Sequence, residues 1–404
     1  MRPLILAARW LRPSPARWVE GGGLLVHGGR VMRIAASPAG LRRLARGARR
    51  LDLGDVVIAP GFVNAHAHLE LSALSGALPR GSDFAGWIRR LLELRAGRSA
   101  AELEQGARAG ASRCLESGTT CVGDVDSTGV AERGLAGHPL RRVHFREVLD
   151  AQERSRTPAA RRRIARALPR RARRMEGLAA HAPFSASPEL LATVGRLSRA
   201  RHAPISVHWS ETREELEWLQ DGSGPLARLL GASPRRSGLD LLEEAGILRA
   251  PLALVHGNHP RPGEPARIAL AGAVVVHCPG SHAWFERAPF PLESYRRAGV
   301  PVALGTDSLA SNEDLDLGRE MRLSMESIPG LGPLAAWAMA TESGAKALGL
   351  EGRAGGLEVG SWADVAVHRC DATALRGRLE ELAWGASRVE SAWIGGRLAA
   401  GRIP

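Results

Sequence analysis

The sequence predicts a (β/α)₈ barrel to which both ends of the chain add a small β-rich part. Eight short apolar runs lie in the middle of the 404-residue chain, and stretches with helical periodicity separate most of them. Alternating apolar and polar residues with glycine turns mark both ends. Eight strand–helix units over roughly 290 residues suit this barrel, whose usual size is about 250 residues before insertions.

The two ends of the chain carry the hairpin signals. Leu24–Ile34 alternates around Gly28 and Gly29, a glycine pair that favours a tight turn between antiparallel strands. Near the other end, Ala363–Arg369 and Val389–Leu398 read as strands. We therefore expect β-structure at both ends.

The middle of the chain contains the barrel strands. Between them, the periodicity predicts helices such as those over residues 101–118 and 262–273. The eight expected strands are Val57–His68, Thr119–Val125, Arg142–Val148, Leu178–Phe184, Pro204–Glu211, Leu252–Asn258, Val274–Ser281 and Val300–Ser308.

Composition excludes several classes of protein. Hydrophobic residues make up 44% of the chain, which is too many for a disordered protein. No window holds the ~18 unbroken apolar residues of a membrane span, and the first residues lack a secretion signal. The four cysteines form no C-x-x-C pair, so neither a disulfide framework nor a thiolate zinc site is indicated. We expect a cytoplasmic protein.

The net charge of +13 comes almost wholly from arginine, since Lys346 is the only lysine. The densest basic run is Arg161–Arg174. It suits a nucleic-acid patch or, as we prefer, a solvated helical face. No helix-turn-helix or zinc-finger pattern accompanies the run, so we expect no nucleic-acid partner and no membrane partner.

Histidine or carboxylate residues, which can bind metals or transfer protons, lie at the ends of most of the expected strands. The carboxyl ends of barrel strands converge on one mouth, where active sites lie. Core packing alone does not explain apolar runs that end in histidine this often. These residues are His66, His68, His181, His208, Glu211, His256, His277, His282 and Asp307.

Part of this set fits a metal site. In a strand, residues two apart share a face, so His66 and His68 can bind one ion together. With His208, His256 and Asp307 on other strand ends, imidazole nitrogens and a carboxylate surround an open position for water. This donor set suits one catalytic divalent ion, with zinc the first choice and iron, manganese or nickel the alternatives.

Two other metal arrangements are disfavoured. No lysine precedes Lys346, which follows the last barrel strand, so neither a carboxylated lysine between two metals nor a Schiff base is expected. His68-Leu69-Glu70 matches the first half of another zinc deaminase pattern, but no P-C-x-x-C follows. We therefore expect a single ion.

Six segments in order along the chain resemble the amidohydrolase superfamily, in particular its cytosine, guanine and S-adenosylhomocysteine deaminases and triazine hydrolases. The resemblance implies a small β-sandwich from residues 1–59 and 354–404, and a metal-dependent hydrolase barrel over 60–353. The segments are Pro60–Ser72, His181–Ser187, His208–Glu211, Val255–His259, His277–Phe285 and Ala303–Asn312.

The resemblance also implies roles. The metal ligands would be His66, His68, His208 and Asp307, and Asp307 would also take the water proton. Glu211 would move a proton to the ring nitrogen, unless it merely begins a solvated acidic stretch. His256 would polarise the oxygen of the tetrahedral intermediate.

Three further residues are expected to bind substrate. His181 resembles the family's substrate-contacting histidine. Trp87 lies in a segment where related deaminases carry a ribose-binding glutamate, but Ala85 stands at that position here. His282 replaces the family's asparagine, which leaves its role open.

The implied function is an aminohydrolase in which a metal-bound hydroxide releases ammonia from an adenine-type ring. Glu211–Gly231 and Asp83–Ile88 look most like aminodeoxyfutalosine deaminases of menaquinone biosynthesis. The alternatives are a chloro- or amidohydrolase acting on a triazine or cyclic amide, and, in a different class, a nucleic-acid-binding protein. We expect a small-molecule substrate and, by analogy with related barrels, a homodimer.

Overall fold

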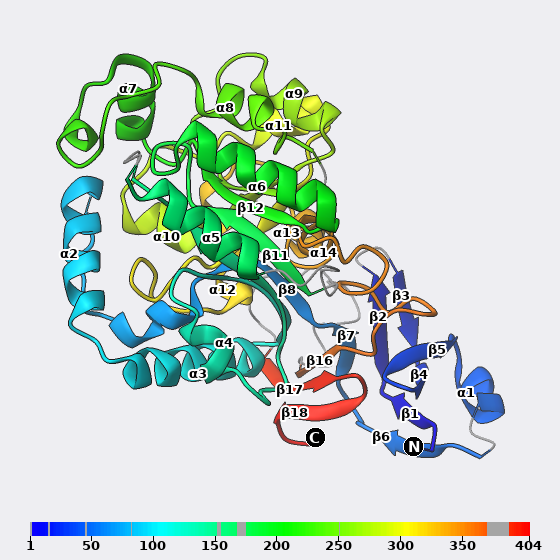
Figure 1. Cartoon of the computed structure of the whole chain (residues 1–404). Coiled ribbons are helices and arrows are strands. Elements are labelled where there is room, and N and C mark those ends of the chain that lie inside the picture. The colour runs from blue at the N-terminus through cyan, green and yellow to red at the C-terminus, as the bar shows by residue number, and fades with distance from the viewer. Residues whose placement is uncertain are drawn as a thin grey trace.

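Eight parallel strands form the centre of the computed structural model, and helices surround them (Figure 1). The structure describes residues 2–14, 17–44, 47–81, 83–151, 155–167, 175–249, 251–369 and 388–404. The strands follow one another in chain order around the sheet, as a (β/α)₈ barrel requires. They are β8 (Phe62–Ala67), β9 (Thr119–Asp126), β10 (Arg141–Val148), β11 (Glu176–Ala180), β12 (Ile205–Trp209), β13 (Leu252–His256), β14 (Val274–His277) and β15 (Val302–Leu304).

Backbone hydrogen bonds close the sheet between its first and last strands. Ala67 and Asp307 form a parallel bridge. The His68 amide donates to the Asp307 carbonyl at 2.9 Å, and the Thr306 amide donates to the His66 carbonyl at 3.0 Å. The predicted barrel is therefore confirmed, and its closure lies at residues predicted to carry chemistry.

Helices cover the outside of the barrel. Their chain order is α2 (Phe84–Ala96), α3 (Ala100–Glu116), α4 (Val130–Gly134), α5 (Thr157–Ala167), α6 (Pro188–Arg201), α7 (Arg213–Asp221), α8 (Gly238–Glu244), α9 (Glu264–Leu270), α10 (Pro279–Trp284), α11 (Leu292–Ala298), α12 (Leu317–Ser327), α13 (Pro333–Met339) and α14 (Glu342–Ala347). Two short 3₁₀ helices, Leu69–Leu74 and Pro225–Arg228, complete this part of the chain. Among the described residues, none of the helices combines the length and hydropathy needed to cross a membrane.

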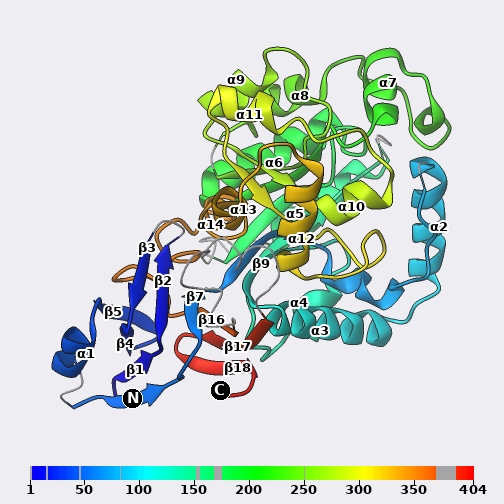
Figure 2. The ribbon, with the colours of Figure 1, turned by 180° about the vertical axis from the view of Figure 1, so that it is seen from behind.

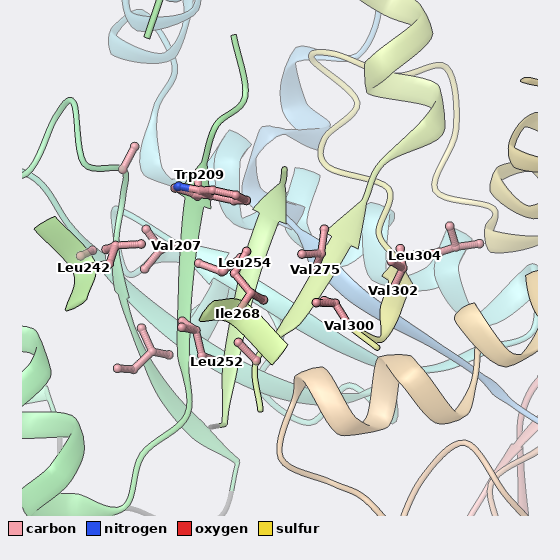
Figure 3. Packing of buried hydrophobic residues seen from close by; sticks show 14 of the residues in the cluster. Val207, Trp209, Leu242, Leu252, Leu254, Ile268, Val275, Val300, Val302 and Leu304 are labelled. Atoms are coloured by element: carbon pink, nitrogen blue, oxygen red, sulfur yellow. The ribbon is translucent and has the colours of Figure 1, made fainter. Parts of the chain in front are cut away.

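The strand–helix interface holds the largest apolar cluster (Figure 3). Val207 and Trp209 of β12 and Leu254 of β13 pack there with Leu242 of α8 and Ile268 of α9. Since strand residues alternate between faces, His208 lies on the opposite face of β12 from Val207 and Trp209. Apolar packing on one side thus orients a polar residue on the other.

Two further sheets come from the chain ends, as Figure 2 shows beside the barrel. One has the order β5-β4-β1-β6, with β1 (Leu4–Ala7), β4 (Gly23–His27), β5 (Arg30–Ala35) and β6 (Arg49–Asp52). The other has the order β18-β17-β16-β7-β2-β3, with β2 (Trp10–Ser14), β3 (Arg17–Glu20), β7 (Val57–Pro60), β16 (Val365–Arg369), β17 (Arg388–Ile394) and β18 (Arg397–Gly401). The remaining helix, α1 (Pro38–Leu44), follows β5.

The predicted hairpin is confirmed, because β4 and β5 pair around Gly28 and Gly29, whose φ angles are 59° and 78°. The first expected barrel strand was too long at its start. Val57–Pro60 is a separate strand of the six-stranded sheet, paired with β16. The chain crosses from one sheet to the other at Gly61, where a Cβ atom would lie only 2.1 Å from the Thr120 hydroxyl oxygen.

Two other predictions reach beyond the described residues. α5 contains the first part of the basic run Arg161–Arg174, but residues 168–174 lie outside the described chain. Three cysteines are buried free thiols, and Cys370 lies outside the described residues.

A buried ion pair joins the barrel to the six-stranded sheet. Arg141, the first residue of β10, donates from Nε and Nη2 to Asp364 at 2.5 and 3.1 Å. The Asp364 side chain is 5% exposed and also accepts from the Gly395 amide in the β17–β18 turn. Loss of the arginine would leave this carboxylate without its counter-charge.

We expect Arg141→Gln to lower the free energy of unfolding by about 2–3 kcal/mol, because it leaves a buried charge unpaired. Arg297→Gln, in an ion pair whose arginine side chain is 78% exposed, should change it by less than about 0.5 kcal/mol. Urea denaturation of both variants measures the difference. Equal losses would contradict the assigned role of Asp364.

Candidate metal centre and active site

Four predicted metal ligands meet at the carboxyl ends of three barrel strands. His66 is on β8 and His68 directly follows it, His208 is on β12, and Asp307 follows β15. The Nε2 atoms of His68 and His208 lie 3.3 Å apart. Asp307 Oδ1 lies 3.7 Å from His66 Nε2 and 3.9 Å from His68 Nε2. The structure therefore brings all four side chains together.

The tautomers of two histidines indicate a cation between them. His68 Nδ1 lies 3.1 Å from the Val125 carbonyl, and His208 Nδ1 lies 2.8 Å from the His181 carbonyl. Because a carbonyl only accepts, each Nδ1 carries the proton and each Nε2 presents a lone pair. Two lone pairs that face each other at 3.3 Å repel unless a cation lies between them.

His66 gives independent support for the same cation. Both of its ring nitrogens are buried and neither has a hydrogen-bond partner. A buried polar group without a partner is unfavourable by about 1–3 kcal/mol, so such an atom calls for a ligand. His66, His68 and His208 could hold a metal ion, since their ligand atoms lie within 4.8 Å of one another.

Two serines orient the carboxylate of Asp307. Ser281 and Ser311 donate to Oδ2 at 2.7 and 2.8 Å, which leaves Oδ1 facing the histidines. Burial works to raise the pKa of Asp307, but its contact with His66 and the nearby histidines hold that pKa well below its usual range. The carboxylate is therefore ionised at neutral pH.

Burial favours neutral imidazoles around this carboxylate. It lowers the pKa of His208 to about 3 and that of His181 to about 4, and it holds those of His68 and His256 well below the usual value. Neutral imidazole is the form that binds a metal. The site thus presents neutral nitrogen donors and one anionic oxygen.

His256 reaches the site through an unusual backbone conformation. Leu252 and Leu254 of the same strand pack against the outer helices, and strand alternation would direct His256 the same way. Its φ of 73° ends this alternation, and its ring lies 5.5 Å from that of His208. Asp307 also has a positive φ, 56°. Such conformations cost about 1–3 kcal/mol each and persist where the surroundings enforce them.

Glu211 lies between His256 and an arginine. Its Oε2 is 3.7 Å from His256 Nε2, and its Oε1 accepts a 2.9 Å hydrogen bond from Arg287 Nη2. Burial raises the pKa of Glu211 to about 8, and the charge of Arg287 opposes this shift. The carboxyl group can therefore hold or release a proton near neutral pH.

The predicted substrate residues differ in their surroundings. His181 is half-buried, with Nδ1 hydrogen-bonded to the Ser185 hydroxyl at 2.6 Å and its ring 4.8 Å from that of His208. Trp87 of α2 packs against Phe84 and Phe285. His181 thus borders the four clustered ligands, whereas Trp87 belongs to an aromatic group.

His282 makes contacts with the protein at both ring nitrogens. Its Nε2 donates to the Ala288 carbonyl at 2.7 Å, and its Nδ1 lies 3.2 Å from Asn258 Oδ1. Asn258 in turn donates to the Glu211 carbonyl at 3.0 Å. His277 stacks on Phe290 with ring centroids 4.0 Å apart, so it is part of the packing.

Four residues at the site were not predicted from the sequence: Arg287, Ser281, Ser311 and Glu147. The serines lie within the segments that carried the resemblance, but nothing in their spacing marked them. Glu147 ends in a buried Oε1 without a hydrogen-bond partner, 4.0 Å from His208 Nδ1. It forms a second possible ligand group with His181 and His208. Because His208 Nδ1 already donates to a carbonyl, the group around His66 is the better metal site.

Sequence comparison agrees with this geometry. The model of the amidohydrolase family matches residues 57–390, which include the whole barrel. The chain belongs to the amidohydrolase family. It is thus a hydrolase that acts on carbon–nitrogen bonds, and the amidohydrolase deaminases bind one divalent metal ion.

Amidohydrolases similar in sequence are named as deaminases. The chain is 34% identical to an aminodeoxyfutalosine deaminase of Deinococcus radiodurans, over 81% of each chain. It is 30% identical to a 5-methylthioadenosine/S-adenosylhomocysteine deaminase of Halobacterium salinarum, over 91% of this chain and 85% of the relative.

Solved amidohydrolase structures share the fold. Helicobacter pylori aminofutalosine deaminase in complex with methylthio-coformycin superposes with a TM-score of 0.85 at 24% identity, covering 98% of this chain and 100% of the other. A zinc-bound adenosine deaminase of Xanthomonas campestris superposes with a TM-score of 0.81 at 24% identity, covering 99% and 93%.

We expect His66→Ala and His208→Ala to lose the bound metal, while His27→Ala, on the exposed side of β4, keeps it.

Removal of the ion with a chelator should lower the melting temperature, because an ion present at ~1,000 times its Kd stabilises by about 4 kcal/mol. Binding should weaken as pH falls, since protonation of the imidazoles competes with the metal. Elemental analysis and thermal melts test this, and full metal content in His66→Ala would contradict the assignment.

Proposed function

We propose that this amidohydrolase is a deaminase that releases ammonia from the adenine-type ring of a nucleoside, with aminodeoxyfutalosine as the first candidate substrate. The position of Glu211 carries the proposal, because an ionisable carboxyl group faces His256 beside the ligand cluster. The names of the sequence relatives support the substrate class. This substrate would place the reaction in menaquinone biosynthesis.

The four clustered side chains would hold one divalent ion, for which zinc is our first choice. When bound, the ion would activate a water molecule by lowering its pKa to about 7. His66, His68 and His208 would supply nitrogen donors, and Asp307 would supply Oδ1 and accept the proton of the attacking water. Ser281 and Ser311 donate hydrogen bonds to Asp307 Oδ2, which leaves Oδ1 free to bind the ion and accept the proton.

Glu211 and His256 would act on the substrate. Deamination needs a proton on the ring nitrogen next to the attacked carbon, and Glu211 Oε2 could carry it. His256 would donate from its imidazole to the oxygen that develops negative charge on that carbon. Its left-handed backbone conformation supports this role, because it turns the ring toward that of His208, 5.5 Å away.

Substrate recognition would involve three further side chains. His181 Nε2 is left for the substrate, because Nδ1 is bonded to Ser185. The buried Oε1 of Glu147 could accept from a ribose hydroxyl, which suits the alanine at position 85 where related deaminases carry a glutamate. Trp87 would contribute apolar contact at the rim. His282 would instead lie beside Asn258, which donates to the Glu211 carbonyl.

Several earlier expectations stay predictions. They are the division into residues 60–353 and residues 1–59 with 354–404, the homodimer, the cytoplasmic location and the lack of nucleic-acid or membrane partners.

Triazine hydrolases superpose with TM-scores of 0.83–0.84 at 19–20% identity, which shows a shared fold alone. Halide or amide hydrolysis is therefore an outcome of the test rather than a second proposal.

The test is ammonia release by metal-loaded protein from aminodeoxyfutalosine, adenosine, 5-methylthioadenosine, S-adenosylhomocysteine, guanine and cytosine. We expect turnover of an adenine-type nucleoside. Activity on none of the six by protein with full metal content would contradict the deaminase proposal and favour halide or amide hydrolysis.

Glu211→Gln should lower kcat on the active substrate at least about 10²-fold, because the amide cannot carry the proton. Its metal content should stay unchanged, since Glu211 is not among the ligands. Glu217→Gln, on the exposed face of α7, is the matched control and should keep full activity. Unchanged kcat in Glu211→Gln would exclude this carboxyl group as the proton carrier.

A further inference from the structure

Arg287 is a buried arginine that donates two hydrogen bonds to Glu211, the proposed proton carrier. Its side chain is only 9% exposed. Nη2 donates to Glu211 Oε1 and Nη1 donates to the Glu211 backbone carbonyl, both at 2.9 Å. Two bonds from one planar guanidinium fix a partner's orientation as well as its distance.

Aromatic rings hold the guanidinium itself in place. Its central carbon lies 4.8 Å from the ring centroid of Phe285 and 5.5 Å from that of Phe84. Phe84 begins α2 and Phe285 follows α10, so two separate segments fix Arg287. In the part of the chain that the structure describes, Glu211 is the only acidic residue within ion-pair distance of Arg287.

The contact distinguishes the two oxygens of the Glu211 carboxylate. Oε1 is occupied by Arg287, while Oε2 faces His256 Nε2 at 3.7 Å. A carboxylate without such a partner could rotate and present either oxygen. We propose that Arg287 is a positioning residue, which holds Glu211 with Oε2 toward the reacting ring.

The surroundings of Glu211 explain why an arginine is needed. Burial raises the pKa of Glu211 to about 8, and neighbouring carboxylates raise it further, while Arg287 opposes them. Without Arg287, the Glu211 carboxyl group would be a weaker acid and would release its proton to the ring nitrogen less readily. The ionisable groups that face Glu211 are Arg287 after α10, His256 at the end of β13, Asp307 after β15, and Glu214 and Glu215 of α7.

The kinetic test compares Arg287→Gln and Arg287→Lys with Arg141→Gln. Arg141 is the matched control, because it also pairs with a buried carboxylate but lies at the six-stranded sheet. We expect Arg287→Gln to lower kcat at pH 7 at least about 10-fold with KM changed less than about 3-fold. The alkaline limb of its pH–rate profile, which reports loss of the Glu211 proton, should move up by about one unit. Arg287→Lys should restore part of the rate, and the control should keep the wild-type profile.

A second measurement needs no substrate. Thermal melts of the wild type, Arg287→Gln, Glu211→Gln and the double variant form a double-mutant cycle. Arg287→Gln should lower the melting temperature by at least about 2 °C in the wild type and by clearly less in Glu211→Gln. Additive shifts would show that the two side chains do not interact and would overturn the proposal.

The two measurements separate two kinds of failure. The positioning role rests on the proposed deamination, whereas the contact does not. If no substrate releases ammonia, the proposed function fails, and the cycle still decides whether Arg287 holds Glu211. If kcat and KM of Arg287→Gln change without a shift of the pH profile, as expected for general loss of stability, the positioning role is wrong.

Discussion

The hydrogen bonds that join β8 to the segment after β15 determine the rest of the site. The His66 carbonyl accepts from the Thr306 amide, and the Asp307 carbonyl accepts from the His68 amide. Each bond belongs to the backbone of a predicted ligand. The contact that closes the barrel therefore also sets the distances between two histidines and the carboxylate. A barrel closed in another register would not form the donor set.

The polar groups that barrel closure brings together need hydrogen-bond partners, because a buried polar group without one is unfavourable. Glu320 provides some of it, with Oε2 accepting from the Gly280 amide and Oε1 from the Asn312 side chain, both at 2.7 Å. These residues adjoin Ser281 and Ser311, which hold Asp307. The support ends at His66, whose ring nitrogens have no hydrogen-bond partner. An ion bound there would supply the missing partner.

Features that depend on local spacing could be predicted from the sequence. Alternation placed His66 and His68 on one face, and the strand order placed His208 and Asp307 at the same mouth. The strand break at Gly61 could not be predicted, because it follows from the close approach of Thr120, far away along the chain. Arg287 could not be predicted either, since it is one of 55 basic residues and only the fold brings it to Glu211.

X-ray absorption spectroscopy of the metal-loaded protein tests the central claim most directly. The account predicts a first shell of three imidazole nitrogens and at least one oxygen, with Zn–N distances of about 2.0–2.1 Å if the ion is zinc. Disappearance of that shell in His66→Ala, which is expected to lose the ion, would confirm the assignment. A shell that contains sulfur, or one that His66→Ala leaves unchanged, would contradict it.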